Sequence, residues 1–148
     1  MAVEYLVRNT TNGEHTPNLI GTPSAPVTLT AAYSGNIVSF VAGNLKVIIL
    51  YVFYVPAQSS RTLYVQVEGS ANNSNWAKKI IFLETDTSGE STMLGHIAKL
   101  EGTTGGETYS ARYVITVADP FVRIAVKESG AANFGTAFVQ AAGEFNTM

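Results

Sequence analysis

The sequence predicts an all-β protein, an antiparallel β-sandwich or jelly-roll-like barrel with an extended N-terminal arm. Threonine, valine and isoleucine are abundant, and these β-branched side chains suit a pleated, half-buried surface. Several runs alternate apolar and polar residues with a period of two, as in residues 61–68 and 121–127. Glycine, asparagine, serine and proline interrupt these runs at short intervals, which is typical of strands joined by turns.

Residues 1–26 are assigned to the N-terminal arm and residues 27–148 to a single sandwich domain. Residues 9–26 contain three prolines and no sustained periodicity, a composition typical of an extended segment. The arm begins with a short apolar strand, and strand donation to a neighbouring subunit is one use of such an arm. The alternative is an edge strand that returns to the sheet of its own chain. The expected partner-contact residues are Val3, Tyr5, Leu6 and Val7.

Each run between two turn signals predicts one strand. Residues 45–55, LKVIILYVFYV, form the most apolar run, which is well short of the ~20 residues of a membrane-spanning helix. Its aromatic and β-branched content predicts a strand buried on both faces. Residues 91–101 also match helical spacing, so a short helix is the alternative there. The expected strands lie near residues 3–8, 27–33, 36–41, 45–55, 62–68, 76–83, 92–100, 108–117, 121–127 and 135–141.

Composition narrows the classes of function. The chain has 148 residues and no cysteine, which allows one domain with a sizeable core but excludes disulfides and thiolate chemistry. With a net charge of −2, the chain lacks the excess of basic residues that is typical of proteins that bind nucleic acid or an anionic membrane. Only 14% of the residues are charged, against about 25% in ordinary globular proteins. This neutrality favours a surface that partners cover, with an uncharged polar surface as the alternative.

Few residues are suited to catalysis or metal binding. Neither His15 nor His96 stands in a recognisable catalytic context, and no nucleophile motif is present. Residues 84–90, ETDTSGE, offer oxygen ligands for a weak calcium site, with a solvated acidic loop as the favoured alternative. The glycine-rich residues 102–106 lack the lysine of a phosphate-binding loop and predict a turn. We therefore expect no enzymatic activity, no cofactor and no metal.

Residues 63–76, LYVQVEGSANNSNW, are the most distinctive segment. A strand ends in Val67-Glu68-Gly69-Ser70, an asparagine-rich turn follows, and Asn75-Trp76 opens the next strand. The segment resembles the EGSxDGxNW turn of discoidin-like and galactose-binding-like β-sandwiches, and a turn of small structural proteins of tailed bacteriophages. The strands at 112–114 and 121–124 and the hairpin at 129–139 resemble the same group, so the resemblance covers about residues 45–140.

This resemblance implies a non-enzymatic virion protein, most simply a capsid decoration (cement) protein that binds the assembled capsid and stabilises it. Its expected partners are the major capsid protein or other virion proteins and further copies of itself, with a trimer favoured. The expected location is the capsid surface, after synthesis in the host cytoplasm without a signal peptide. A head-to-tail connector or a tail-associated protein is the alternative within the same class.

A carbohydrate- or receptor-binding module is the alternative outside that class. Such a module needs aromatic side chains that stack on a sugar, and the candidates are Tyr64, Trp76 and Tyr109. Trp76 is expected in the core, where it would cover the end of the sandwich. The turn also departs from the discoidin-like pattern, because Asn73 is the nearest match to the usual aspartate. We therefore rank this alternative below the virion protein.

Overall fold

A computed structural model provides the fold. The structure describes residues 3–5, 7–8, 15–16, 18–33, 38–41, 45–78, 82–86, 91–94, 97–116 and 119–145. Across these residues the chain forms strands and no helix, and every strand pair is antiparallel. The all-β prediction is therefore confirmed.

The first sheet has the strand order β1-β15-β7-β13-β10. Short strands pair with β15 at one edge, and β10 pairs with β13 at the other. The long strands are β7 (Leu45–Val55), β13 (Tyr109–Thr116) and β15 (Thr136–Phe145). The shorter strands are β1 (Val3–Tyr5), β4 (Asn18–Ile20), β5 (Val27–Thr28) and β10 (Phe82–Asp86).

The second sheet has the strand order β11-β12-β8-β14-β6, with β9 also paired to β8. Its long strands are β8 (Arg61–Ser70) and β14 (Phe121–Glu128). The others are β6 (Val38–Val41), β9 (Ala77–Lys78), β11 (Ser91–Leu94) and β12 (Ile97–Gly102). A separate two-stranded sheet joins β2 (Val7–Arg8) to β3 (His15–Thr16).

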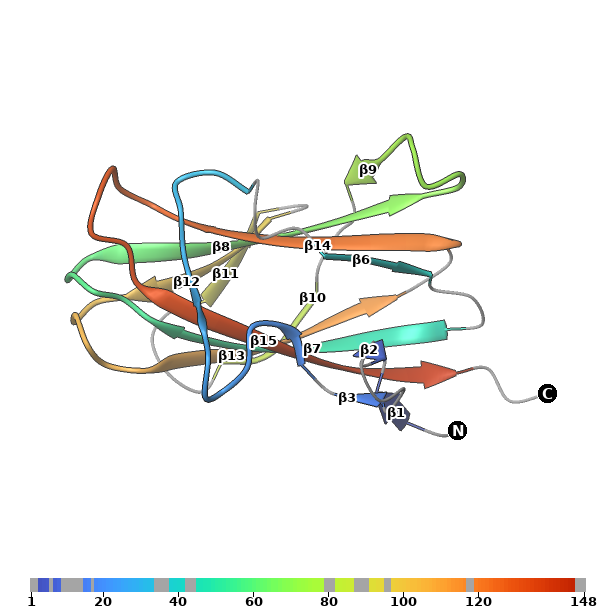
Figure 1. Cartoon of the computed structure of the whole chain (residues 1–148), viewed down its shortest axis with the longest axis horizontal. Helices are drawn as coiled ribbons and strands as arrows, with labels where there is room; N and C mark the ends of the chain where they lie inside the picture. The colour runs from blue at the N-terminus through green and yellow to red at the C-terminus, as the bar shows by residue number, and fades with distance from the viewer. Residues whose placement is uncertain are drawn as a thin grey trace.

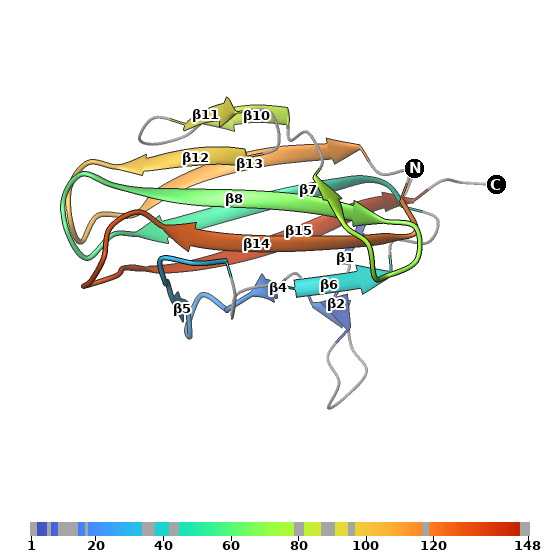
Figure 2. The same ribbon diagram turned by 90° about the horizontal axis from the view of Figure 1, so that it is seen from above.

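The two main sheets lie face to face, with β8 and β14 in one layer and β7, β13 and β15 in the other (Figures 1 and 2). Alternate side chains of each strand point into the space between them. The inward positions are fully buried, among them Leu50 and Val52 of β7 and Val65 and Val67 of β8. Because only every second side chain enters this core, each sheet keeps an outer face.

Three loops meet at one end of the sandwich, on the left in Figures 1 and 2: residues 56–60, 103–108 and 129–135. The Gly106 amide donates a hydrogen bond of 2.7 Å to the Pro56 carbonyl. The Arg61 guanidinium donates hydrogen bonds of 2.9 Å to the carbonyls of Ser129 and Ala132. These bonds hold the three loops against one another.

A buried polar pair joins the two sheets near the same end. Glu128 of β14 is 1% exposed, and the Tyr54 hydroxyl of β7 donates a hydrogen bond to its Oε2 atom. The Gly135 amide donates to Oε1 of the same carboxylate at 2.7 Å. Burial, followed by the hydrogen bond to Glu128, raises the pKa of Tyr54 far above its usual value. Glycine is required at position 135, because a Cβ atom there would collide with the Val55 carbonyl.

The structure corrects several of the expected strands. Residues 45–55 form one long strand, but the residues from 47 onward are fully buried on one face only. Residues 92–100 are divided between β11 and β12, which pair as a hairpin, so both the single strand and the helical alternative are wrong. Residues 76–83 are divided between β9 and β10, which belong to different sheets. Of residues 27–33, only Val27–Thr28 form a strand.

The core begins before residue 27. Leu19 and Ile20 belong to the hydrophobic core, with exposed fractions of 7% and 3%. They are buried because β4 pairs with β15 at the edge of the first sheet. The sandwich therefore includes Leu19 and Ile20, which were expected in the arm.

Candidate interaction surfaces

Of the N-terminal residues expected to contact a partner, those that the structure describes belong to strands that pair within their own chain. Val3 to Tyr5 pair with the last residues of β15, with Tyr5 opposite Ala142. Val7 pairs with Thr16 in the small sheet, and Leu6 lies outside the described residues. This is the pairing of the edge-strand alternative. Contact of these residues with another molecule stays a prediction.

The candidate metal and catalytic residues are only partly described. Residues 87–90 of the proposed calcium loop and His96 lie outside the described residues. Among the residues that are described, no group of three or more histidine, aspartate or glutamate side chains could hold a metal ion. Within the same residues, no helix has the length and apolar character needed to cross a membrane.

The outer face of the first sheet carries a group of seven apolar side chains, called the apolar face below, next to the outward Ser110, Arg112, Thr136 and Gln140. Its side chains stand at alternate positions of the three long strands, and all are partly exposed. Phe53 stacks on Phe138 with a centroid distance of 4.6 Å and an interplanar angle of 15°. The Arg112 guanidinium lies 5.8 Å from the centre of the Tyr51 ring. The apolar face consists of Val47, Ile49, Tyr51, Phe53, Val55, Val114 and Phe138.

The outer face of the second sheet has the opposite character and is called the polar face below. Glu68 of β8 accepts hydrogen bonds from Nη2 and Nε of Arg123 at 2.7 and 3.0 Å. Tyr64 of β8 lies between Lys99 and Lys127, whose ammonium groups are 5.5 and 5.3 Å from the centre of its ring. The polar face consists of Thr62, Tyr64, Gln66, Glu68, Lys99, Glu101, Arg123 and Lys127.

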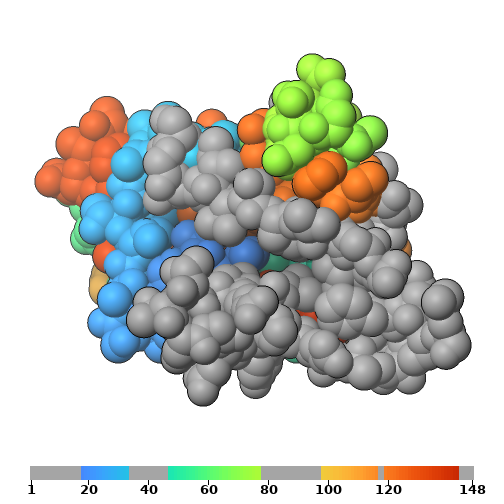
Figure 3. Space-filling view, turned by 45° about the vertical axis from the view of Figure 1, so that its right-hand side comes forward, coloured from blue at the N-terminus to red at the C-terminus, as the bar shows by residue number. Residues whose placement is uncertain are grey.

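Trp76 lies on the surface of the second sheet, so its expected place in the core is wrong. It is partly exposed, and the Arg123 guanidinium lies 4.5 Å from its ring centre. Figure 3 shows the green turn before β9 standing out from the surface next to the orange start of β14. The tryptophan packs against this arginine because Arg123 is fixed by its ion pair with Glu68.

The turn before Trp76 has the conformation that its asparagines predict. Asn72 Oδ1 accepts hydrogen bonds of 2.9 Å from the amides of Ser74 and Asn75. Asn73 adopts a left-handed backbone with a φ of 61°, which asparagine tolerates better than most residues. The prediction of a tight asparagine-rich connection is therefore confirmed.

The other two aromatic candidates differ in exposure. Tyr109 is 5% exposed, and its hydroxyl accepts a hydrogen bond of 2.8 Å from the Thr104 amide. A side chain held in this way ties down the 103–108 loop and offers no face to a sugar. Of these two tyrosines, Tyr64 is the one that the structure places on an outer face.

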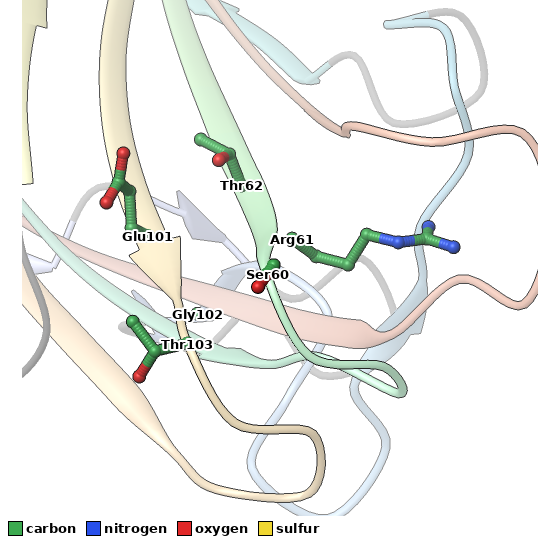
Figure 4. Close-up of a pocket in the computed structure, with 6 residues that line it drawn as sticks. All are labelled: Ser60, Arg61, Thr62, Glu101, Gly102 and Thr103. Carbon is green, nitrogen blue, oxygen red and sulfur yellow. The ribbon is translucent and has the colours of Figure 1, made fainter.

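A small pocket opens beside the polar face, between the start of β8 and the end of β12. Its volume is about 170 Å³. Ser60 adopts a left-handed backbone with a φ of 59°, an uncommon conformation for a serine. Figure 4 shows the Arg61 side chain extending away from those of Glu101 and Thr62. The pocket is lined by Ser60, Arg61, Thr62, Glu101, Gly102 and Thr103.

Two comparisons with known proteins identify no relative of this chain. A scan against models of protein families gives no match, and a search of curated protein sequences gives none either.

Proposed function

We propose that this protein is a non-enzymatic structural protein of a bacteriophage virion, of the capsid decoration type, that docks on the assembled particle through its apolar face. The observation that carries the proposal is the row of seven partly exposed valine, isoleucine, tyrosine and phenylalanine side chains on the first sheet. Contiguous apolar patches of this kind mark interaction sites in soluble proteins. The low charged fraction of 14% and the resemblance of residues 63–76 to phage structural proteins support the same proposal.

The energetics favour a flat, multi-residue contact. Full burial of one valine, isoleucine or phenylalanine side chain stabilises a complex by about 1.5–3 kcal/mol, and these side chains gain less because they are already partly buried. Association costs at least about 4 kcal/mol in lost translational and rotational freedom. Several side chains must therefore be buried together, which a sheet face achieves in one contact. Binding to the assembled particle and not to free coat protein would stabilise the shell by mass action.

Co-sedimentation with particles tests this proposal. Purified protein is mixed with particles that lack it, and the pellet is measured for the wild type, Phe53→Glu and Phe121→Glu. Both phenylalanines are partly exposed on outer faces, but Phe53 belongs to the apolar face and Phe121 to β14 of the second sheet. We expect the wild type and Phe121→Glu to pellet and Phe53→Glu to remain in solution. Circular dichroism establishes that both variants are folded.

Two results would overturn the proposal. If the wild-type protein stays in solution with intact particles, the particle-docking function is wrong. If folded Phe53→Glu sediments as well as the wild type, the apolar face is not the docking surface.

The number and position of bound copies separate the decoration protein from a connector. A decoration protein occupies many sites over the shell, and we propose trimers at its three-fold positions. A connector occupies one ring at the vertex that carries the tail. Electron microscopy of particles carrying the protein distinguishes the two arrangements directly.

A further inference from the structure

The pocket beside the polar face is built from oxygen-bearing side chains. Thr62 lies opposite Glu101 in the pairing of β8 with β12, and both side chains point to the outer face. Ser60 and Thr103 complete the rim, where the Ser60 amide donates a hydrogen bond of 3.3 Å to the Thr103 carbonyl. Hydroxyl and carboxylate groups arranged in this way can accept and donate hydrogen bonds to a ligand rich in hydroxyl groups.

Two lysines stand next to this pocket on the same face. Lys99 precedes Glu101 by two residues along β12, which is about 7 Å at the usual rise of a strand. Within the part of the chain that the structure describes, neither Lys99 nor Lys127 forms an ion pair with a carboxylate. The nearby Glu68 is already bound to Arg123. The two ammonium groups therefore form a positive spot on a chain whose net charge is −2.

Aromatic rings hold these lysines in place. The Lys127 ammonium lies 4.9 Å from the centre of the Tyr33 ring and 5.3 Å from that of Tyr64. Lys99 approaches the same Tyr64 ring at 5.5 Å. Each cation–π contact is worth about 0.5–1 kcal/mol at an exposed site and restricts a flexible side chain before any ligand binds. Preorganisation of this kind lowers the entropic cost of binding.

The chemistry of the face favours a carbohydrate over a protein partner. Lysine and glutamate are depleted from protein interfaces, whose centres are rich in apolar and aromatic anchors. Here the outward side chains around Tyr64 are threonine, glutamine, lysine and glutamate. The pocket of about 170 Å³ is smaller than the roughly 300–1,000 Å³ of sites for drug-sized ligands, so it suits a single small ring.

We propose that this surface binds an acidic oligosaccharide, with one sugar ring in the pocket and the carboxylate of a neighbouring sugar beside Tyr64, within reach of Lys99 and Lys127. Thr62 and Glu101 bind sugar hydroxyls, and the lysines select the charged sugar. The site lies on the sheet opposite the apolar face, so a particle-bound subunit can present it outward.

Calorimetric titration of the purified protein with a trimer of galacturonic acid tests the proposal. The matched neutral probe is a trimer of galactose, and the matched variants are Lys99→Gln and Arg112→Gln. Both substitutions remove one positive charge, but Arg112 lies on the first sheet. We expect the acidic trimer to bind more tightly than the neutral one. Lys99→Gln should weaken its binding about tenfold, the loss expected for one charge-assisted hydrogen bond, and Arg112→Gln should leave it unchanged.

Several outcomes would overturn the proposal. The first is no binding of the galacturonic acid trimer at millimolar concentration. The second is equal weakening by Lys99→Gln and Arg112→Gln, which would mean that only net charge attracts the probe. The third is tighter binding of a short polyglutamate peptide, which would mean that the face recognises an acidic protein segment. Because no particle is present, these results are independent of the docking experiment.

Discussion

The outer faces of the two sheets share one geometry and differ in chemistry. In both, alternation sends every second side chain of long antiparallel strands away from the core. On the first sheet these positions carry Phe53, Tyr51 and Phe138, and on the second they carry Tyr64, Lys127 and Arg123. The alternation of each strand therefore sets which side chains face outward. The polarity of those side chains sets whether water can hydrate the face or whether apolar surface stays exposed.

On the polar face, long side chains cover the shorter residues between them. Gln66 and Ala125 point outward on neighbouring strands, yet they are only 8% and 3% exposed. Long side chains such as Arg123 and Lys127 lie over such positions with their apolar stems while keeping their charges in water. The residues of the apolar face are short or rigid, and Arg112 is the long side chain shown to lie over one of them, the Tyr51 ring. Under the proposed function, the particle completes the burial of this face.

The buried pair of Tyr54 and Glu128 joins the two sheets, and its removal should have the largest effect on stability. Glu128→Ala should lower the free energy of unfolding by about 3 kcal/mol. The Tyr54 hydroxyl and the Gly135 amide would then be buried without an acceptor, at about 1–3 kcal/mol each. Urea denaturation measures the loss. Glu101→Ala, at an exposed position, is the control and should change stability little.

Two double-mutant cycles measure the side-chain couplings on the two faces. On the polar face, substitution of Glu68 and Arg123 by glutamine should give a coupling energy of about 1 kcal/mol or less, because the two side chains are 15% and 27% exposed. On the apolar face, substitution of Phe53 and Phe138 by leucine should give about 0.5–1.5 kcal/mol.

The salt dependence of the two coupling energies distinguishes a charge interaction from an apolar contact. Raising the salt concentration to about 1 M shortens the screening length to about 3 Å and should reduce the Glu68–Arg123 coupling. The Phe53–Phe138 coupling should persist. Urea denaturation at low and high salt measures both cycles. Equal salt sensitivity of the two couplings would contradict the assignment of charge to one face and apolar contact to the other.

Alkaline pH should change the stability of the protein slightly through Tyr33, at the border of the polar face. Burial, and next the neighbouring Tyr64 and Glu68, raise the pKa of Tyr33 from 10.0 to about 12. The unfolded chain therefore loses this proton first, so the contribution of Tyr33 to stability is complete below pH 10 and falls as the pH rises towards 12. Tyr33→Phe should lose less stability over this window. Urea midpoints between these pH values, together with phenolate absorbance, measure the difference.

The strands with clear alternation were predictable to within two or three residues. Residues 62–68 and 121–127 correspond to β8 and β14, because one buried and one exposed face impose a period of two on the sequence. The hairpin of β11 and β12 was missed, because a single glycine within residues 92–100 did not signal a reversal of the chain. Trp76 was misplaced because its size suggested the core, whereas its actual partner is Arg123.

Local patterns in the sequence were enough to predict the class of fold and the inward side chains of β8 and β14, where apolar and polar residues alternate. They were not enough for β7, whose apolar run was expected to be buried on both faces and, from residue 47 onward, is fully buried on only one. Which strands are neighbours depends on how the whole chain folds. Lys99 and Lys127 flank Tyr64 because β12 and β14 pair with opposite edges of β8. Likewise, Phe53 reaches Phe138 because β15 pairs with β7. Pairing between distant segments follows from how the whole chain buries its apolar surface, and no local pattern encodes it.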